Sequence, residues 1–482
     1  MIPSRTSTSR RRFLRRTFAI GTAAAGSSCS WFGQPLEEVR VGICGFHGKG
    51  MHHIRDLLGR RGVRIVALCD VDGRVMDEGL KVLGDRGYKP TAYKDYRKFV
   101  EDKELDGVII ATPNHSHTLI AMTAMAAGKH VYVEKPVCHN IAEGRLLVDA
   151  AHRHPELIVT HGLQLRSDEG RDEAFAWVKE GHLGPMTLSR GLNYKARESI
   201  GKLSAPDRIN SRIDYDLWCA CRPVVPVMRD KFHYDWHWQW PYGNGDIGNQ
   251  GPHQLDVARW AIDQPRLPPR MMSLGNRWGY VDDGQTPNNQ LAFFDYDPVP
   301  ILFDNRGLPL KDMNWKQEPV YQGIRIGNIL HCEGGWLAEG RAYDNAGKSV
   351  EKFSTSGGSS HMENWLQSIR DGRLASPHLD IAHGHVSASL AHLANISYRI
   401  GKTASPDEVR ERLQGHALAQ QTLQDFQSNL DANGIDMAVE KAVLGPWLEI
   451  DPETEAFVGE FAAEANALRE ETYREGHELP VI

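Results

Sequence analysis

The stretch VRVGICGFHGKGMHHI, residues 39–54, decides the fold that we expect for this chain. Its first seven residues have the apolar pattern of a buried strand, and the rest is typical of a loop that opens a helix. Gly45 and Gly50 hold the first and last places of a G-x-G-x-x-G turn, where glycines allow a tight turn and close packing. His47 takes the middle glycine place, although Gly48 beside it gives the backbone of the turn some conformational freedom. The stretch predicts a strand, a phosphate-facing turn and a helix.

Three further apolar strands extend this unit. Residues 64–70 end in Asp70, near the spacing at which a carboxylate binds the ribose hydroxyls of NAD. Residues 107–111 run into a polar turn and then a helix over residues 118–128. Residues 131–133 form the next strand. Strands that alternate with helices predict an α/β domain with a doubly wound parallel sheet.

The ends of these strands supply the candidate cofactor site. Asp70 favours NAD over NADP, because a 2′-phosphate would face a like charge, although a turn aspartate is the alternative interpretation. Small and polar residues after the third strand would let the backbone lie under a dinucleotide. The candidate cofactor-binding residues are Gly45, His47, Gly48, Gly50, Asp70, Thr112, Asn114, His117, Glu134 and Lys135.

Lys135 stands out because Pro136 follows it. Proline fixes its own φ and pushes the preceding residue into an extended conformation. The side chain of Lys135 would then project from the strand end, where open α/β sheets bind ligands. A surface lysine that closes a strand is the alternative.

A second set of candidates lies beyond the first domain. Residues 231–242 hold six aromatic side chains in twelve positions, and Trp236 and Trp238 could pack on the C–H faces of a sugar, or could belong to a core or a subunit contact. His253 and Asp256 lie three residues apart, on one face of an expected helix. Gln164 and Arg166, on an expected strand, are further substrate-binding candidates, although Arg166 could equally form a structural ion pair.

Together these motifs resemble the Gfo/Idh/MocA family of glucose-fructose oxidoreductase, inositol dehydrogenase and rhizopine-catabolism proteins, and in particular its exported bacterial members. The resemblance covers about residues 38–400 and includes residues 161–166, 243–256, 361–365 and 395–399. It implies a Rossmann domain, then an α/β domain on a large, mostly antiparallel open sheet. It also implies NAD or NADP and a sugar or cyclitol substrate. The expected domains are residues 38–160, 161–400 and a helical extension over residues 401–482.

The resemblance also implies catalytic roles. Oxidation of a carbinol needs a proton acceptor near the hydroxyl and a hydride acceptor across the carbon. His253, with a pKa near neutral, would take the proton, and the ammonium of Lys135 would stabilise the alkoxide. The family commonly has a carboxylate four residues before this histidine, where this chain has Asn249. Asp246 or Asp256 would then substitute for it, or the proton path differs.

Composition and the N-terminal sequence indicate which partners and which compartment to expect. The net charge of −6 argues against a nucleic-acid partner, and seven scattered cysteines lack the spacing of a metal site or a disulfide framework. Residues 9–15 resemble a twin-arginine export motif, and residues 17–26 are too short to anchor the chain in a membrane. We therefore expect residues 1–37 to be a leader and linker and the twin-arginine translocase to be a transient partner. The mature protein is expected to be a homo-oligomer that is periplasmic or otherwise exported by this route.

Three function classes remain open on the sequence. The first is an NAD-dependent oxidoreductase that acts on CH–OH groups. The second is a redox-neutral lyase, epimerase or glycosidase in which NAD oxidises a sugar carbon transiently. The third is a non-catalytic sugar or nucleotide sensor, which a fold alone does not exclude. Export favours tightly bound NAD, since the compartment outside the cytoplasm offers little free NAD to exchange.

Overall fold

The computed structural model describes residues 38–415 and 417–482. The expected leader, residues 1–37, lies outside this range. Within the described ranges, no helix combines the length and the apolar character needed to cross a membrane.

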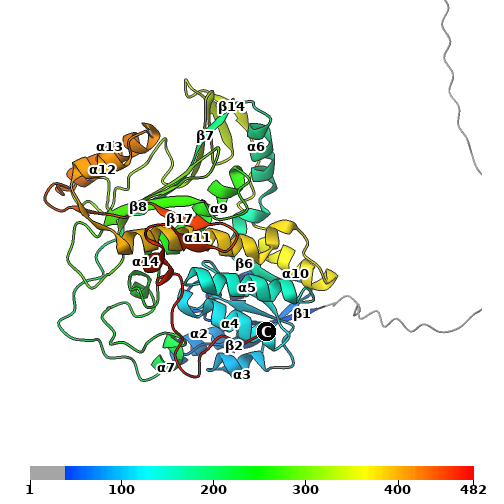
Figure 1. Cartoon of the computed structure of the whole chain (residues 1–482). Coiled ribbons are helices and arrows are strands. Elements are labelled where there is room, and N and C mark those ends of the chain that lie inside the picture. The colour runs from blue at the N-terminus through cyan, green and yellow to red at the C-terminus, as the bar shows by residue number, and fades with distance from the viewer. Residues whose placement is uncertain (1–37, 416) are drawn as a thin grey trace, which may run out of the picture. The chain divides into compact units, whose positions relative to one another are not determined.

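The first domain is built on a six-stranded parallel sheet (Figure 1). Its strand order is β3-β2-β1-β4-β5-β6, which confirms the doubly wound fold. The strands are β1 Val39–Cys44, β2 Val63–Cys69, β3 Thr91–Tyr93, β4 Gly107–Ile110, β5 His130–Val133 and β6 Val159–His161. The connecting helices are α1 Lys49–Leu57, α2 Gly73–Gly84, α3 Tyr96–Val100, α4 His117–Ala126 and α5 Ile141–Arg153. All four residues of β4 are buried, as expected of a central strand with helices on both faces.

The second domain is built on a twelve-stranded sheet. Its neighbouring strands pair antiparallel, except that β7 and β10 are parallel, which confirms the expected large, mostly antiparallel sheet. Its main path runs β14-β13-β12-β11-β7-β10-β9-β8-β16-β15. The strands before the C-terminal extension are β7 Met186–Tyr194, β8 Arg270–Asn276, β9 Asn289–Phe294, β10 Ile301–Arg306, β11 Ile326–Cys332, β12 Gly335–Ala338, β13 Arg341–Asp344 and β14 Ser349–Lys352.

Two helices that follow the strands of the second domain pack against the first. Helix α11, Ile381–Ile400, contacts α5 and β6 of the first domain as well as β8 and α9, Gly251–Ala261, of the second. Helix α10, His361–Asp371, packs Trp365 into the core under β1 and β4. The segment that we expected to belong wholly to the second domain therefore returns to complete the first.

The C-terminal extension folds back on the body and is helical only in part. Helices α12, Pro406–Arg412, and α13, Ala417–Asp431, pack residues such as Phe426 on the large sheet. The extension also contributes β15 Lys402–Ala404, β16 Ala442–Leu444, β17 Leu448–Asp451, β18 Ala456–Val458 and the short helix α14 Ala462–Asn466. Strands of three or four residues are too short to show a two-residue period, so the expectation of an all-helical extension missed them.

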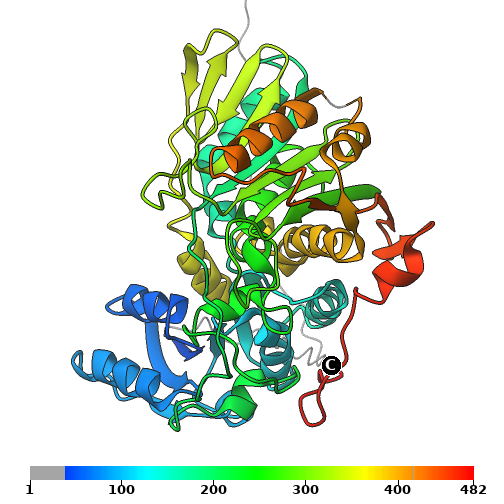
Figure 2. The same ribbon diagram turned by 90° about the vertical axis from the view of Figure 1, so that its left-hand side faces the viewer.

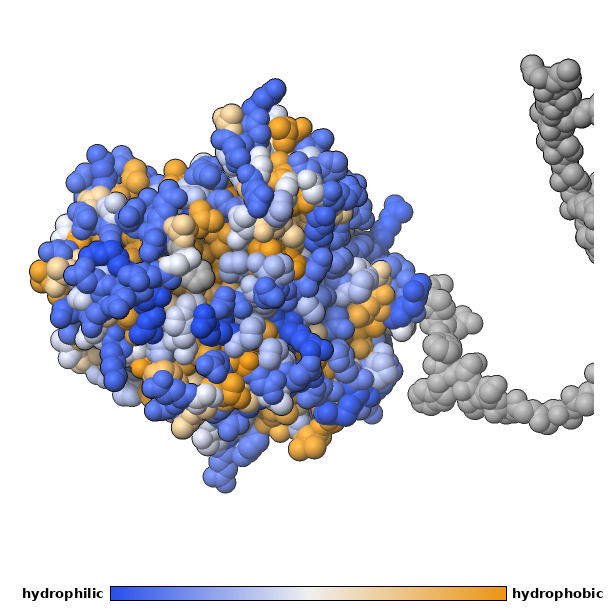
Figure 3. All heavy atoms as spheres, turned by 45° about the horizontal axis from the view of Figure 1, so that its top comes forward, coloured by the Kyte–Doolittle hydropathy of each residue, from blue (hydrophilic) through white to orange (hydrophobic). Residues whose placement is uncertain are grey.

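The last residues of the chain run down along the first domain (Figure 2). Tyr473 donates a hydrogen bond to Glu143 of α5, and Arg153 donates one to the backbone oxygen of Ile482. The face drawn in Figure 3 is mostly hydrophilic, with hydrophobic residues in small groups.

Residues 195–242, which we call the cover segment, leave the second domain at the end of β7 and lie against the first. Ile213 forms an antiparallel bridge with Asp72, and the backbone nitrogen of Gly73 donates to the oxygen of Arg212 over 3.0 Å. The cover segment contains the short helix α7, Tyr215–Cys219, and a 3₁₀ turn, Asp235–Trp238. It therefore closes one side of the space above the parallel sheet.

Candidate active site

A cleft of about 420 Å³ lies at the carboxyl ends of the parallel strands. The glycine-rich turn and Asp70 line one part of it, and Lys135 and His253 line another. This is where open α/β sheets bind ligands. Of the site residues predicted from the sequence, those that line the cleft are Gly45, His47, Gly48, Asp70, Thr112, Asn114, His117, Glu134, Lys135, Gln164, Trp236, Asn249 and His253.

The glycine-rich turn has the shape needed beside a pyrophosphate. Gly45 has a φ of +77°, and a Cβ on Gly50 would lie 2.1 Å from the backbone oxygen of Gly45, so glycine is required at both places. A Cβ on Gly48 would meet nothing within 4 Å. Helix α1 has no side-chain cap, and its first turn has no acidic residue. Its first N–H groups therefore suit the phosphates of a dinucleotide.

Asp70 follows β2 directly and lines the cleft. Its carboxylate accepts hydrogen bonds from the backbone nitrogens of Phe46 at 3.0 Å and Asp72 at 2.9 Å. Each oxygen keeps a second acceptor site, so the group still fits the ribose hydroxyls. Burial raises the pKa of Asp70 to about 6.

Several cleft residues already have protein partners. The ring nitrogens of His117 lie 2.7 Å from the backbone oxygens of Thr112 and Pro136. Glu134 is buried and lies 2.8 Å from Nε2 of His53. Gln164 donates to Glu134 over 3.2 Å. It starts a 3₁₀ turn rather than lying on the expected strand. These contacts make His117 and Glu134 supports for the cleft wall.

Lys135 extends from the end of β5 towards the second domain. Its Nζ donates to the backbone oxygen of Asn249 at 2.5 Å and lies 3.4 Å from Asn249 Oδ1. Burial lowers the pKa of Lys135 to about 8, because the ammonium is poorly solvated there. Asn249 thus contacts the lysine, although an amide cannot accept its proton.

His253 lies in the first turn of α9 and lines the same cleft. Burial, together with the positive charge of Lys135, lowers its pKa to about 3. The expected near-neutral pKa of this histidine is therefore not found. A neutral His253 can hold a hydroxyl by a hydrogen bond, but it is a weak base beside an ammonium.

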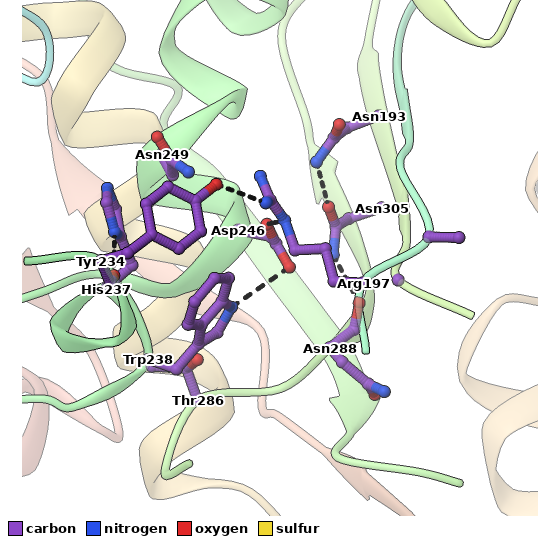
Figure 4. Close-up of polar contacts among 12 residues, drawn as sticks. Asn193, Arg197, Tyr234, His237, Trp238, Asp246, Asn249, Thr286, Asn288 and Asn305 are labelled. Carbon is purple, nitrogen blue, oxygen red and sulfur yellow. Dashed lines mark hydrogen bonds and ion pairs between the residues drawn. The ribbon is translucent and has the colours of Figure 1, made fainter. Parts of the chain in front are cut away.

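Asp246, one of the two expected substitutes for the missing carboxylate, is buried and paired (Figure 4). It lies on the short helix α8, Gly245–Asn249. Nε of Arg197 donates to its Oδ1 over 2.5 Å, and Nε1 of Trp238 donates to its Oδ2 over 3.3 Å. Trp238 therefore orients Asp246 from a buried position outside the cleft lining, whereas Trp236 lines the cleft.

His237 is a cleft residue that we did not select from the sequence. Its Nδ1 lies 2.5 Å from the backbone oxygen of Tyr234, so Nδ1 is the donor and Nε2 is left as an acceptor. Its ring stacks on Trp236 with centroids 3.7 Å apart. The only available signal was its place among the aromatic residues 231–242, where histidines are as easily structural.

Arg166 and Asp256 lie away from the cleft lining, in a buried ion pair. NH2 of Arg166 donates to Oδ1 of Asp256 over 2.8 Å, and both side chains are at most 3% exposed. Arg259 and Ser387 also donate to Asp256. This geometry corrects the expected substrate contacts of both residues and leaves Asp256 unable to replace a carboxylate at position 249.

The comparisons with known proteins agree with the first domain. Residues 39–161 match the Gfo/Idh/MocA oxidoreductase family, NAD-binding Rossmann fold. An inositol 2-dehydrogenase of Salmonella paratyphi B is 26% identical over 180 residues, which cover 37% of this chain and 52% of the relative. A glycosyl hydrolase family 109 protein of Shewanella amazonensis is 35% identical over 172 residues, which cover 34% of this chain and 37% of the relative.

The chain thus spans about half the length, or less, of these curated relatives. Similarity of fold extends further. The crystal structure of myo-inositol 2-dehydrogenase from Lactobacillus plantarum superimposes with a TM-score of 0.53 at 18% identity, covering 76% of this chain and 98% of that one. The similarity of fold therefore extends beyond the first domain into the second.

Proposed function

We propose that this protein is an NAD-dependent oxidoreductase that acts on a CH–OH group of a sugar, a cyclitol or a derivative of one. The observation that carries the proposal is that one cleft joins the phosphate-facing turn at Gly45 to Lys135 and His253. The match of residues 39–161 to an NAD-binding oxidoreductase fold supports the cofactor. Asp70 supports NAD rather than NADP.

The pKa values of the two candidate groups suggest their roles. NAD, when bound, would supply the hydride acceptor. A catalytic base works best with a pKa near the working pH, which fits Lys135 at about 8 and not His253 at about 3. We therefore assign proton acceptance to the neutral amine of Lys135 and positioning of the hydroxyl to His253. This reverses the roles that the sequence suggested.

A redox-neutral reaction is the second candidate. Relatives named glycosyl hydrolase family 109 proteins reach 35% identity, against 26% for the inositol 2-dehydrogenases. Transient oxidation of a sugar carbon by NAD would acidify the neighbouring C–H and permit elimination. The cover segment is hydrogen-bonded to the first domain, so it would help to hold a bound NAD in place. A retained cofactor suits both candidate reactions. Retention also suits the export that we propose for this chain.

The test starts from protein purified without added nucleotide. We expect denaturation to release about one NAD per chain, and a sugar panel to change the absorbance of the reduced nicotinamide band. Lys135→Ala and His253→Ala should each retain NAD and lose about a hundredfold or more in turnover. Lys348→Gln, in the exposed turn between β13 and β14, is the matched control.

Two outcomes separate the candidates. Sugar that is altered without accumulation of reduced nicotinamide indicates the redox-neutral reaction. A panel in which no sugar is altered and none changes the cofactor spectrum indicates a sensor and contradicts both enzymatic proposals. Protein that carries little nucleotide and needs millimolar NAD for activity contradicts tight binding.

A further inference from the structure

Helix α7 of the cover segment forms one wall of the cleft. Leu217 and Trp218 lie in this helix, Ala220 directly follows it, and all three line the cleft. The helix belongs to the chain after β7, outside the strands and helices of the dinucleotide-binding fold. This wall is therefore additional to the one that the glycine-rich turn and Asp70 provide.

The wall lies on the Asp70 side of the cleft. The backbone nitrogen of Asp214, the N-cap of α7, donates to the oxygen of Val71 over 3.0 Å. The ammonium of Lys94 lies 3.3 Å from the carboxylate of Asp214. Val71 adjoins Asp70 after β2, and Lys94 directly follows β3. The strand order places β2 and β3 on one side of β1, and β5, which precedes Lys135, on the other. Helix α7 therefore lies at the end of the cleft away from Lys135.

This end of the cleft suits an adenine ring. A doubly wound sheet binds one nucleotide on each half, and the acid after β2 binds the ribose of the first. A dinucleotide with its pyrophosphate at the glycine-rich turn and its ribose at Asp70 would extend its base beyond Asp70. The faces of a purine need apolar and aromatic neighbours. The cleft offers them here from both domains: Val71, Tyr96, Ile120, Leu217, Trp218 and Ala220.

Residues 469–482, which we call the strap segment, contact α7 directly and pass it on their way along the first domain (Figure 1). The guanidinium of Arg474 donates to the backbone oxygen of Asp216 over 2.7 Å and to that of Ala220 over 3.0 Å. It also pairs with the carboxylate of Asp216. The backbone nitrogen of Arg474 donates to the oxygen of Cys221 over 3.1 Å. One arginine therefore fixes both the helix and the turn that ends it.

The backbone at Ala220 needs such support. Its φ of +48° lies in the left-handed region, which favours glycine over residues with a Cβ. A residue persists in this region when its surroundings hold it there. Arg474 holds the carbonyl groups of Ala220 and Cys221. Because Ala220 lines the cleft, the shape of this wall depends on the strap segment.

The strap segment is itself fixed to the first domain by a buried ionic cluster. Glu471 lies 2.6 Å from NH1 of Arg222, and Tyr473 donates to Glu143 of α5 over 3.0 Å. Arg222 and Glu143 form an ion pair, and their side chains are at most 2% exposed. Removing one partner of a buried ion pair is costly, so this attachment is firm. Arg474, three residues beyond Glu471, extends it to α7.

We propose that α7 closes an adenine subsite and that Arg474 is the positioning residue that keeps it closed. The inference rests on the binding of NAD in the proposed function, and it deepens that function by naming what retains the cofactor. The adenine ring lies under α7, so NAD dissociates when α7 moves away from Val71 and Lys94. The strap segment opposes this movement and slows the loss of NAD.

Hydrogen exchange tests the wall in the unaltered protein. Protein freed of nucleotide is compared alone, with ADP-ribose and with nicotinamide mononucleotide. We expect saturating ADP-ribose to slow exchange of the amides of residues 215–222 about tenfold or more, and nicotinamide mononucleotide to leave them unchanged. Helix α6, Glu169–Lys179, which does not line the cleft, is the internal reference. Exchange that ADP-ribose does not slow overturns the assignment of α7 to the adenine.

Arg474→Gln tests the strap segment. The variant loses the guanidinium that holds Asp216 and Ala220, so NAD should be lost about tenfold faster in timed gel filtration. The affinity for ADP-ribose should fall by a similar factor, whereas that for nicotinamide mononucleotide should not change. Arg410→Gln, which removes an exposed partner of Asp407 on α12, is the matched control. Equal retention of NAD in the two variants, or equal weakening of both nucleotide fragments by Arg474→Gln, overturns the positioning role.

A second variant reaches the adenine subsite without altering the strap segment. Leu217 is half-buried and lines the cleft, so Leu217→Ala removes apolar surface from the wall and leaves the contacts of Arg474 in place. Its affinity for ADP-ribose should fall about fivefold, with that for nicotinamide mononucleotide unchanged. An unchanged affinity for ADP-ribose would contradict the subsite.

These outcomes are separable from those of the proposed function. Binding of ADP-ribose requires no sugar, so an adenine subsite in a protein that alters no sugar would contradict the enzymatic proposals alone. Reduction of the nicotinamide by a sugar, with equal retention of NAD in Arg474→Gln and the unaltered protein, would contradict the role of the strap segment alone.

Discussion

The imidazole rings of His47 and His233 stack with their centroids 4.4 Å apart and their planes 20° apart. His47 belongs to the glycine-rich turn, and His233 to the cover segment. Nε2 of His233 also lies 2.9 Å from Oδ2 of Asp72, at the N-terminus of α2. The residue that departs from the usual glycine pattern is therefore part of a contact that joins the cover segment to the first domain.

We predict that His233→Ala speeds the loss of NAD. The variant removes the ring contact with His47 and the hydrogen bond to Asp72, which together contribute about 1–2 kcal/mol. Dissociation of NAD should become about tenfold faster. The measurement is the nucleotide retained after timed gel filtration. His182→Ala, which removes a histidine stacked on Trp177 at the surface, is the control. Equal retention in both variants would mean that the histidine pair does not hold the cofactor.

The first domain could be predicted from the sequence because its strands are buried on both faces and therefore appear as apolar runs. Lys135, Asn249 and His253 also came together in one cleft, as the resemblance implied. The Arg166–Asp256 pair was less predictable. The same two residue types suit a substrate or a buried ion pair, and only the packing of α9 against α11 decides between them.

The cover segment was the least predictable part. Several of its contacts with the first domain use backbone groups, such as the bridge between Asp72 and Ile213, which no side-chain pattern encodes. The position of His237 in the cleft depends on that placement. Its pKa depends in turn on burial, which residue identity alone does not give.

Asp70 should make NAD binding depend on pH. Its pKa of about 6 means that the carboxylate is charged at pH 7 and largely protonated at pH 5. A protonated carboxyl has less acceptor capacity for the ribose hydroxyls, so NAD should bind more weakly as pH falls through 6. Asp70→Ser should weaken NAD about tenfold or more and remove this pH dependence. Titrations of apoprotein with NAD and NADP measure both effects. Equal affinities of the unaltered protein for the two cofactors would contradict this role of Asp70.

The protonation state in which Lys135 acts should decide whether kcat/KM rises or falls with pH. If its neutral amine accepts the proton, kcat/KM rises as pH increases through about 8, where the ammonium of the free enzyme loses its proton. If the ammonium instead stabilises the alkoxide, kcat/KM falls over the same range. We expect the rise, measured with the sugar that responds in the panel. The rise of kcat/KM through about pH 8 should be absent from the residual activity of Lys135→Ala. It should still be present in the residual activity of His253→Ala.

Asp256→Asn should affect folding rather than substrate binding. The substitution keeps the shape of the side chain but leaves the buried guanidinium of Arg166, and that of Arg259, without a counter-charge. Removing one partner of a buried ion pair costs about 3–5 kcal/mol, whereas an exposed pair contributes less than about 1 kcal/mol. The free energy of unfolding in urea should therefore fall by several kcal/mol. Asp263→Asn, which removes an exposed partner of Lys179, should leave the free energy of unfolding almost unchanged.

Sugar affinity of the folded Asp256→Asn protein should be normal, because the carboxylate does not line the cleft. Unchanged stability with lost sugar affinity would show instead that Asp256 reaches the substrate.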